Sequence, residues 1–184
     1  MGKSALEKNT TADNNVAIGY KALFENTTGT RNIAIGSNAN DLADTENDNI
    51  AIGHDTMTAQ IAGASQNIAI GSYSLDALTT GDANVAIGHN AMTTNTSGEL
   101  NVAIGYQALE ASATAAGGVA IGSKALKTNT ADYNTAVGES ALTANTTGAS
   151  NVAVGRYAMV TNTTASQNTS VGTSSLAVNT TGAD

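Results

Sequence analysis

The feature that most constrains this chain is a phrase of about 17 residues that recurs from one end to the other. Eight of the ten spacings between the glycines that close the phrase are 17 residues; one is 18 and one is 16. Helix-pair repeats need about 33 residues and propeller blades about 40, so this unit is too short for either. Its length suits one coil of a parallel β-solenoid, with strands stacked roughly 4.8 Å apart. The marker glycines are Gly2, Gly19, Gly36, Gly53, Gly71, Gly88, Gly105, Gly122, Gly138, Gly155 and Gly172.

Each phrase contains the pattern of a short strand. Ile or Val precedes every marker glycine after Gly2, and Val or Ile stands two residues earlier in all but two of these phrases, where Thr135 and Thr169 stand. Apolar side chains two apart, with a small one between, predict a strand. Four residues after the marker comes Leu or Met, except at Asn40, where we expect Leu42 to fill the same inward site. We expect the Val and Ile side chains to face into the coil, opposite Leu or Met.

The residue between the two Val or Ile positions is Ala in nine of ten phrases. On an alternating strand this Ala column would then point outward and form a smooth apolar stripe along the rod. Extended apolar stripes mark interfaces, so we predict that identical chains pack stripe to stripe. The predicted interface residues are Ala17, Ala34, Ala51, Ala69, Ala86, Ala103, Ala120, Ala136 and Ala153.

An Asn opens nearly every phrase, and the column is interrupted at Gly118. Stacked Asn side chains can bond the backbone of their own turn and the Asn above or below. We interpret the column as a structural ladder at a corner of the coil, in preference to a row of amides that binds a ligand. The ladder comprises Asn15, Asn32, Asn49, Asn67, Asn84, Asn101, Asn134, Asn151 and Asn168.

The segment that ends each unit is rich in Asn, Thr and Gly, as in Asn-Thr-Thr-Gly, and predicts a polar turn. Thr pairs recur in it at 10–11, 27–28, 79–80, 146–147, 163–164 and 180–181. A regular Thr column leaves an ice-binding face open as an alternative, although Asp44, Ile61 and Ala113 interrupt it. The turns also contain Asn-x-Ser/Thr glycosylation acceptors such as Asn26 and Asn145, for which a turn-forming role is the favoured interpretation.

Composition excludes several classes of partner. The net charge of −8 argues against nucleic acid and against docking on anionic lipid, both of which need a basic face. No apolar run approaches the roughly 20 residues of a membrane span. The chain has no Cys, no Pro and one Phe, so its core must be narrow and aliphatic.

No constellation of residues favours an enzyme or a cofactor site. The spacing Asp44, Glu46, Asp48 is similar to a calcium loop, but Asn49 stands where that loop needs Gly, so a solvated acidic loop is favoured. His54 and His89 lie two coils apart, roughly 10 Å along the axis and far for one metal. We predict no catalytic residue, cofactor or metal ligand.

Residues that the repeat does not dictate collect one, two and five positions after the marker glycine. This is where we expect recognition to reside, although the chemistry of these residues is too mixed to name a ligand. The candidate ligand surface comprises Tyr20, Lys21, Phe24, His54, Tyr73, His89, Tyr106, Arg156 and Tyr157.

The phrase Asn-Val-Ala-Ile-Gly followed by Ala-Leu resembles the head repeats of the YadA-like trimeric autotransporter adhesins, and is similar to repeats of phage and bacterial tail fibres. The resemblance spans residues 2–182, and it carries over structural roles only, as for Val16, Ala17, Ile18 and Gly19. It implies a left-handed parallel β-roll of three chains that adheres to host or surface ligands, such as an extracellular protein or glycan. The family's repeat is shorter, so one side of each coil is extended here.

We therefore expect residues 1–184 to form one all-β domain, a homotrimeric left-handed parallel β-solenoid of about ten coils cut from a longer array. Its expected function is that of a non-enzymatic adhesive rod, the head or shaft of an extracellular adhesin on a bacterial surface, with no membrane contact of its own. The alternatives are a tail-fibre segment of a phage or injection system, located on a virion tail in the phage case, and an ice-binding solenoid.

Overall fold

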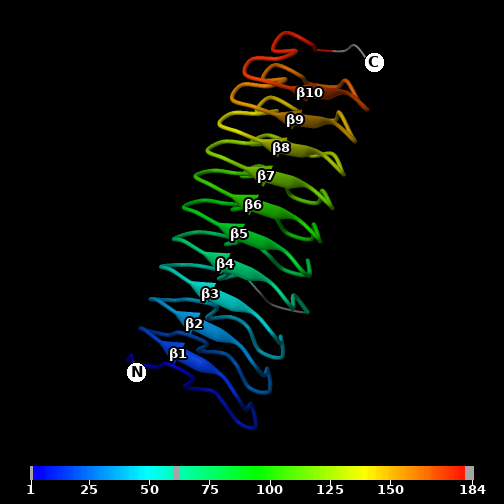
Figure 1. Cartoon of the computed structure of the whole chain (residues 1–184). Helices are drawn as coiled ribbons and strands as arrows, with labels where there is room; N and C mark the ends of the chain where they lie inside the picture. Colours follow the sequence, from blue (N-terminus) through cyan, green and yellow to red (C-terminus); the bar gives the residue numbers. More distant parts are fainter. Residues whose placement is uncertain (1, 60–62, 181–184) are drawn as a thin grey trace.

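The computed structural model describes residues 2–59 and 63–180, in which ten short strands stack in chain order into one parallel sheet (Figure 1). Each strand has three residues. The described part of the chain is a parallel β-solenoid, as the repeat predicts, and has about nine turns where we expected about ten. The strands are β1 (Val16–Ile18), β2 (Ile33–Ile35), β3 (Ile50–Ile52), β4 (Ile68–Ile70), β5 (Val85–Ile87), β6 (Val102–Ile104), β7 (Val119–Ile121), β8 (Thr135–Val137), β9 (Val152–Val154) and β10 (Thr169–Val171).

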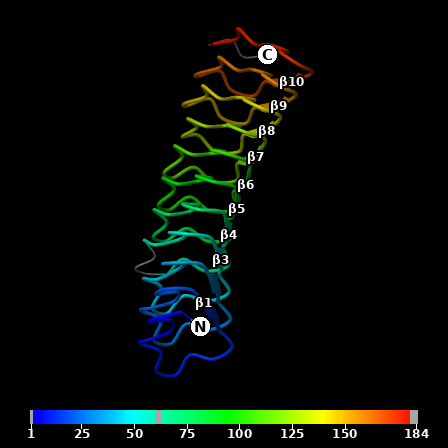
Figure 2. The same cartoon turned by 90° about the vertical axis from the view of Figure 1, so that its left-hand side faces the viewer.

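Equivalent residues of successive coils lie directly above one another. Ala86 of β5 pairs with Ala103 of β6, and the same register holds through the 18-residue and the 16-residue units. The extra and missing residues therefore lie outside the strands. In two perpendicular views the coils form a rod, with the first and last strands at opposite ends (Figures 1 and 2).

Each strand turns the opposite face toward the interior of the coil from the one that we expected. The central Ala of each phrase is buried in the coil, and the Val and Ile side chains on either side lie on the outer face of the sheet. The predicted orientation is therefore wrong, and the Ala column cannot contact another chain. The residues concerned are Ala17, Ala34, Ala51, Ala69, Ala86, Ala103, Ala120, Ala136 and Ala153, of which all but Ala17 are 0% exposed.

The width of the coil explains this orientation. A second buried Ala column lies three residues after the marker glycine, for example at Ala91, and the Leu and Met column lies beside it, as at Met92. A 17-residue coil has room for one column of long side chains between two backbones, so the strand facing that column must contribute a small one. The expected aliphatic interior is present, but Leu and Met supply its bulk.

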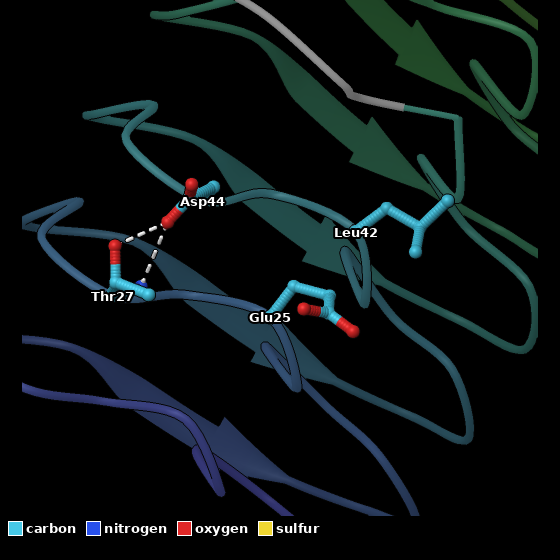
Figure 3. Close-up of a pocket in the computed structure, with 4 residues that line it drawn as sticks. All are labelled: Glu25, Thr27, Leu42 and Asp44. Carbon is cyan, nitrogen blue, oxygen red and sulfur yellow. Dashed lines mark hydrogen bonds between the residues drawn. The ribbon is translucent and has the colours of Figure 1, made fainter.

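One member of the long column is polar. Asn40 is fully buried in the place that Leu23 occupies one coil earlier, and Leu42 is 41% exposed. The expectation that Leu42 fills this interior site is therefore wrong. Leu42 lies six residues after its marker glycine, in a column whose side chains point away from the interior, as does Glu25 in the preceding coil (Figure 3).

The Asn ladder is present as a structural element. The side-chain oxygen of Asn84 accepts the backbone N–H of Asn101 at 3.1 Å and its side-chain amide at the same distance. The Asn101 amide also donates to the Ala115 carbonyl at 2.8 Å, across the coil. Every Asn of the ladder except Asn15 and Asn134 is tied through its backbone N–H to the Asn side chain of the preceding coil. Eight of the nine are at most 2% exposed, and Asn15 is half-buried. Such buried amides have no free surface for a ligand.

The marker glycine ends each strand at a point where no side chain fits. Gly88 has φ +135°, and a Cβ placed on it would lie 2.5 Å from the Gly105 carbonyl oxygen of the next coil. Coils can stack at this corner only because both residues lack a side chain. The chain then turns into the exposed positions that we predicted to carry recognition.

Candidate functional site

The nine residues of the candidate ligand surface fall into three separate groups along the rod. All follow a marker glycine by one, two or five residues, so each is held by a coil corner whose backbone repeats. The first group lies in the coil that follows β1, the second in the four coils that follow β3 to β6, and the third in the coil that follows β9. Most of these side chains are exposed; Lys21, Phe24 and Tyr157 are half-buried.

The middle group is a continuous row of rings, one from each of four successive coils. The ring centroids are 5.7 Å apart from His54 to Tyr73, 5.8 Å from Tyr73 to His89 and 5.9 Å from His89 to Tyr106. The first two contacts are edge-to-face, and the third is stacked. We call these four residues the aromatic row. The expectation that His54 and His89 stand apart overlooked Tyr73, whose ring lies between them.

Backbone hydrogen bonds between coils fix the aromatic row. The Tyr73 N–H donates to the His54 carbonyl at 3.1 Å, and the Gln107 N–H donates to the His89 carbonyl at the same distance. His54 is also paired with Asp55, whose carboxylate is 3.1 Å from its Nδ1. The backbone that carries the rings is therefore held in a regular ladder, so no loop has to be ordered when a partner binds.

The first group is a cation–π cluster that includes a residue absent from our prediction. The Lys21 ammonium lies over the Tyr20 ring at 5.6 Å and over the Phe24 ring at 5.3 Å. Lys8, one coil earlier, lies over the Phe24 ring at 5.2 Å and also pairs with Glu25 at 2.7 Å. The 17-residue spacing of Lys8 and Glu25 could have indicated this pair. The rings of this group are therefore covered by cations of the chain itself.

In the last group, too, the cation and the ring contact each other. The Arg156 guanidinium lies 4.4 Å from the centre of the Tyr157 ring and donates to the Glu139 carboxylate at 3.0 Å. That hydrogen bond raises the pKa of Arg156 above its ordinary value. Glu139 lies one coil earlier, in the same column as Arg156, and is not part of the predicted ligand surface.

A shallow recess lies between two coils near the start of the rod, lined by Glu25, Thr27, Leu42 and Asp44 (Figure 3). The Asp44 carboxylate accepts hydrogen bonds from the hydroxyl and from the backbone N–H of Thr27. Glu25 is held by Lys8. Both carboxylates therefore already have partners, and the recess offers neither a free acid nor a free base.

The carboxylates of the predicted acidic loop point in different directions. Glu46 is 1% exposed and accepts backbone N–H groups from Asp44, Thr45 and Gly63 at 2.6 to 2.9 Å. Asp48 instead accepts from Arg31 at 2.6 Å, which lowers the pKa of that carboxyl. In residues 2–59 and 63–180 no group of three or more His, Cys, Asp or Glu side chains could hold a metal ion.

The Thr column fastens coils together. The Thr79 hydroxyl donates to the Thr96 carbonyl at 2.8 Å, and the Thr96 hydroxyl donates to the Ala113 carbonyl at 3.1 Å. Hydroxyls used in this way cannot donate to ice. Asp44 and Ala113 interrupt the column as expected, whereas Ile61 and Thr181 lie outside the described residues.

The Asn residues of the polar turns are interior residues. Asn26 and Asn145 are 0% exposed, and the Asn145 amide donates to the Gly148 carbonyl three residues on. An oligosaccharide could not be attached to either amide in the folded coil. The turn-forming interpretation of these acceptors is confirmed.

No family model, curated protein or solved structure matches this chain. The described residues contain no helix long and apolar enough to cross a membrane. The candidate functional site that follows from the geometry is the exposed corner of the rod, with the aromatic row as its longest continuous feature.

Proposed function

We propose that this chain is a non-enzymatic segment of an extracellular adhesive rod, of the YadA-like head type, on a bacterial cell surface. The observation that supports this proposal most directly is the separation of roles in each coil. Interior positions repeat with little change, and aromatic and charged residues vary along one exposed corner. A stiff repeat that displays a non-repeating edge is the arrangement of a binding scaffold.

We further propose that three copies assemble, each a left-handed coil, through the outer face of the sheet. Two columns of outward side chains run along the ten strands, and all are Val or Ile except Thr135 and Thr169. Val16 is 43% exposed, Ile18 51% and Ile121 38% in the single chain. An apolar face that runs the length of a molecule marks an interface between proteins. This Val and Ile face replaces the Ala stripe as the expected contact between chains.

Light scattering tests the assembly. We expect the purified chain to have three times its 18.3 kDa mass. The double substitution Ile87→Glu and Ile104→Glu should give a folded monomer, because it places charge on the contact face without entering the coil. Thr94→Glu with Ala111→Glu, both on exposed positions outside the sheet, is the matched control and should stay trimeric. A wild-type monomer would contradict the assembly.

Surface binding tests the adhesive function. A fluorescently labelled chain should attach saturably to animal cells or extracellular matrix, and an excess of unlabelled chain should displace it. Attachment to bacterial envelopes alone would instead support the tail-fibre alternative. Attachment to neither surface would contradict both. Arrest of ice growth at micromolar protein would support the ice-binding alternative.

A further inference from the structure

We propose that the aromatic row binds an uncharged glycan chain that lies along the rod axis. The row consists of His54, Tyr73, His89 and Tyr106, with each ring 5.7 to 5.9 Å from the next. This inference rests on the proposed adhesive function and names the class of ligand that the exposed corner would recognise. It follows from the spacing and exposure of the rings, from the absence of a covering cation, and from the charge of this surface.

The spacing suits a polymer with one unit per coil. Each ring comes from a separate coil, and successive strands in a sheet lie about 4.8 Å apart. A monosaccharide unit of an extended glycan has a similar length, so consecutive sugars can meet consecutive rings. The C–H bonds on one face of a pyranose carry partial positive charge and pack on the negative face of an aromatic ring. Four rings in line can therefore hold about four sugars.

The rings are open to solvent. Tyr73 is 37% exposed, Tyr106 is 48% exposed, and the side chain of His54 is 52% exposed. Within the described residues, neither Tyr hydroxyl in the row hydrogen-bonds to protein. Hydroxyls in this position can exchange hydrogen bonds with those of a sugar. Large, stiff side chains of this kind give contact area at a small entropic cost.

Contrast with the other two groups singles out this row. Lys8 and Lys21 lie over the rings of Tyr20 and Phe24, and Arg156 lies over Tyr157. Those ring faces are covered by the chain's own cations. Over the described residues, no Lys or Arg covers a ring of the aromatic row. It is therefore the one group of the three whose rings are not covered by the chain's own cations, although His89 and Tyr106 stack on each other.

The charges around the row favour an uncharged ligand. The chain carries a net charge of −8, which repels anionic polymers. The nearby carboxylates are already paired and do not invite a cationic peptide. Asp55 contacts His54 at 3.1 Å and accepts from Asn38 at 2.8 Å, and Glu110 is 3.2 Å from Lys127. Aromatic faces with polar groups and little free charge suit neutral sugars.

The test uses the full chain and a set of neutral oligosaccharides of two to six units. The set comprises β-linked and α-linked glucose, N-acetylglucosamine, xylose, mannose and galactose. Binding is followed by calorimetry and by amide chemical shifts. We expect at least one series to bind, with affinity that rises up to about four units and then levels, and with shifts confined to the coils that carry the row.

Substitutions locate the site. Tyr73→Ala with Tyr106→Ala should weaken binding about tenfold or more, as loss of central aromatic anchors does. Tyr73→Phe with Tyr106→Phe keeps the rings and should retain most of the affinity. Tyr133→Ala removes a residue that is 66% exposed and lies outside the row, so it should leave affinity unchanged. Thermal unfolding of each variant checks that the solenoid is intact.

Three results would overturn the inference: no binding to any series, equal loss on Tyr133→Ala, or affinity independent of chain length. Its failure differs from failure of the proposed function. Sugar binding by a chain that attaches to no cell surface would contradict adhesion and leave this site standing. If the chain binds no sugar but attaches to cells, and the double Tyr→Ala variant attaches equally well, adhesion would stand and this site would be refuted.

Discussion

Ala86 and Ile87 are neighbours in β5, yet Ala86 is completely buried inside the coil and Ile87 lies on the outer face of the sheet. This arrangement places the smaller apolar side chain in the interior and the larger one outside. It follows from a coil so narrow that its long side chains come from the opposite wall. The interior therefore limits volume at every strand, and the outer face does not.

Ala86→Leu is expected to destabilise the solenoid. The added atoms must enter a space already filled by the Leu and Met column, and overpacking of this kind costs about 1 to 3 kcal/mol. Chemical denaturation of the Ile87→Glu, Ile104→Glu background measures the loss without a contribution from assembly. In the same background, Val85→Leu adds volume on the outer face and is expected to change stability little. Equal stability of the two variants would contradict the assigned orientation.

Asn40 offers a site where the chain can be stabilised. Its side chain is fully buried in the Leu and Met column, and neither of its polar atoms has a hydrogen-bond partner. Its φ of 51° matches the 50° of Leu23, so Leu is compatible with this backbone. Asn40→Leu should raise the free energy of unfolding by about 1 to 3 kcal/mol, the cost of an unpaired buried polar group.

Thermal and urea unfolding measure the effect of Asn40→Leu. The reverse change at an equivalent position, Leu109→Asn, is the matched control and should lower stability by at least as much. A fall in stability for Asn40→Leu would show that the amide has a partner that its geometry does not reveal.

Gly118 interrupts the Asn ladder and predicts a second stabilising change. The Gly118 N–H still donates to the Asn101 side chain at 2.8 Å, but the N–H of Asn134 lacks the side-chain acceptor that the ladder supplies elsewhere. Gly118→Asn would supply it. A Cβ at this position meets the Asn101 oxygen at 3.1 Å, a tight contact that Gly118→Ala shares.

The difference between the two Gly118 variants isolates the hydrogen bond. We expect Gly118→Asn to be more stable than Gly118→Ala by about 0.5 to 1.5 kcal/mol, the net value of one such bond. Urea denaturation followed by circular dichroism gives both values. Indistinguishable variants would mean that the ladder contributes nothing at this coil.

Much of the fold could be predicted because a stacked repeat gives each column one role. The period, the parallel strands and the Asn ladder all follow from residues such as Asn84 and Asn101. Which face of the strand points inward could not be predicted. The alternation of Val, Ala and Ile shows which side chains share a face, but it does not show which face is interior. Only the width of the coil decides that question.

The aromatic row was predicted as scattered residues and not as a unit. His54, His89 and Tyr106 follow their marker glycines by one residue, whereas Tyr73 follows by two, in the coil after the 18-residue unit. If the residues one position after the marker glycine are considered alone, the coil that contains Tyr73 has no ring. The two positions lie at the same corner of the coil, so a residue two positions after the marker can contact rings one position after it.

Asp41 predicts an unusual dependence of stability on pH. Burial raises the pKa of its carboxyl above the ordinary value of 3.8, and the nearby Asp55 and Asp76 carboxylates act in the same direction, against Lys21. The folded chain therefore holds this proton more tightly than the unfolded chain does. The stability that this group contributes is present below its unfolded pKa and is lost as pH rises through its folded pKa.

Asp41→Asn removes that loss, so the variant should gain stability relative to the wild type at pH 7 and show little gain near pH 3. Asp48 provides the control of opposite sign. The hydrogen bond from Arg31 lowers the pKa of Asp48, so its contribution is present above the unfolded pKa and disappears as pH falls through the folded value. Asp48→Asn should therefore lose stability at pH 7, by a small amount because the pair is exposed. Melting temperatures from pH 3 to pH 7 measure both, and parallel profiles for the two variants would contradict the assignment.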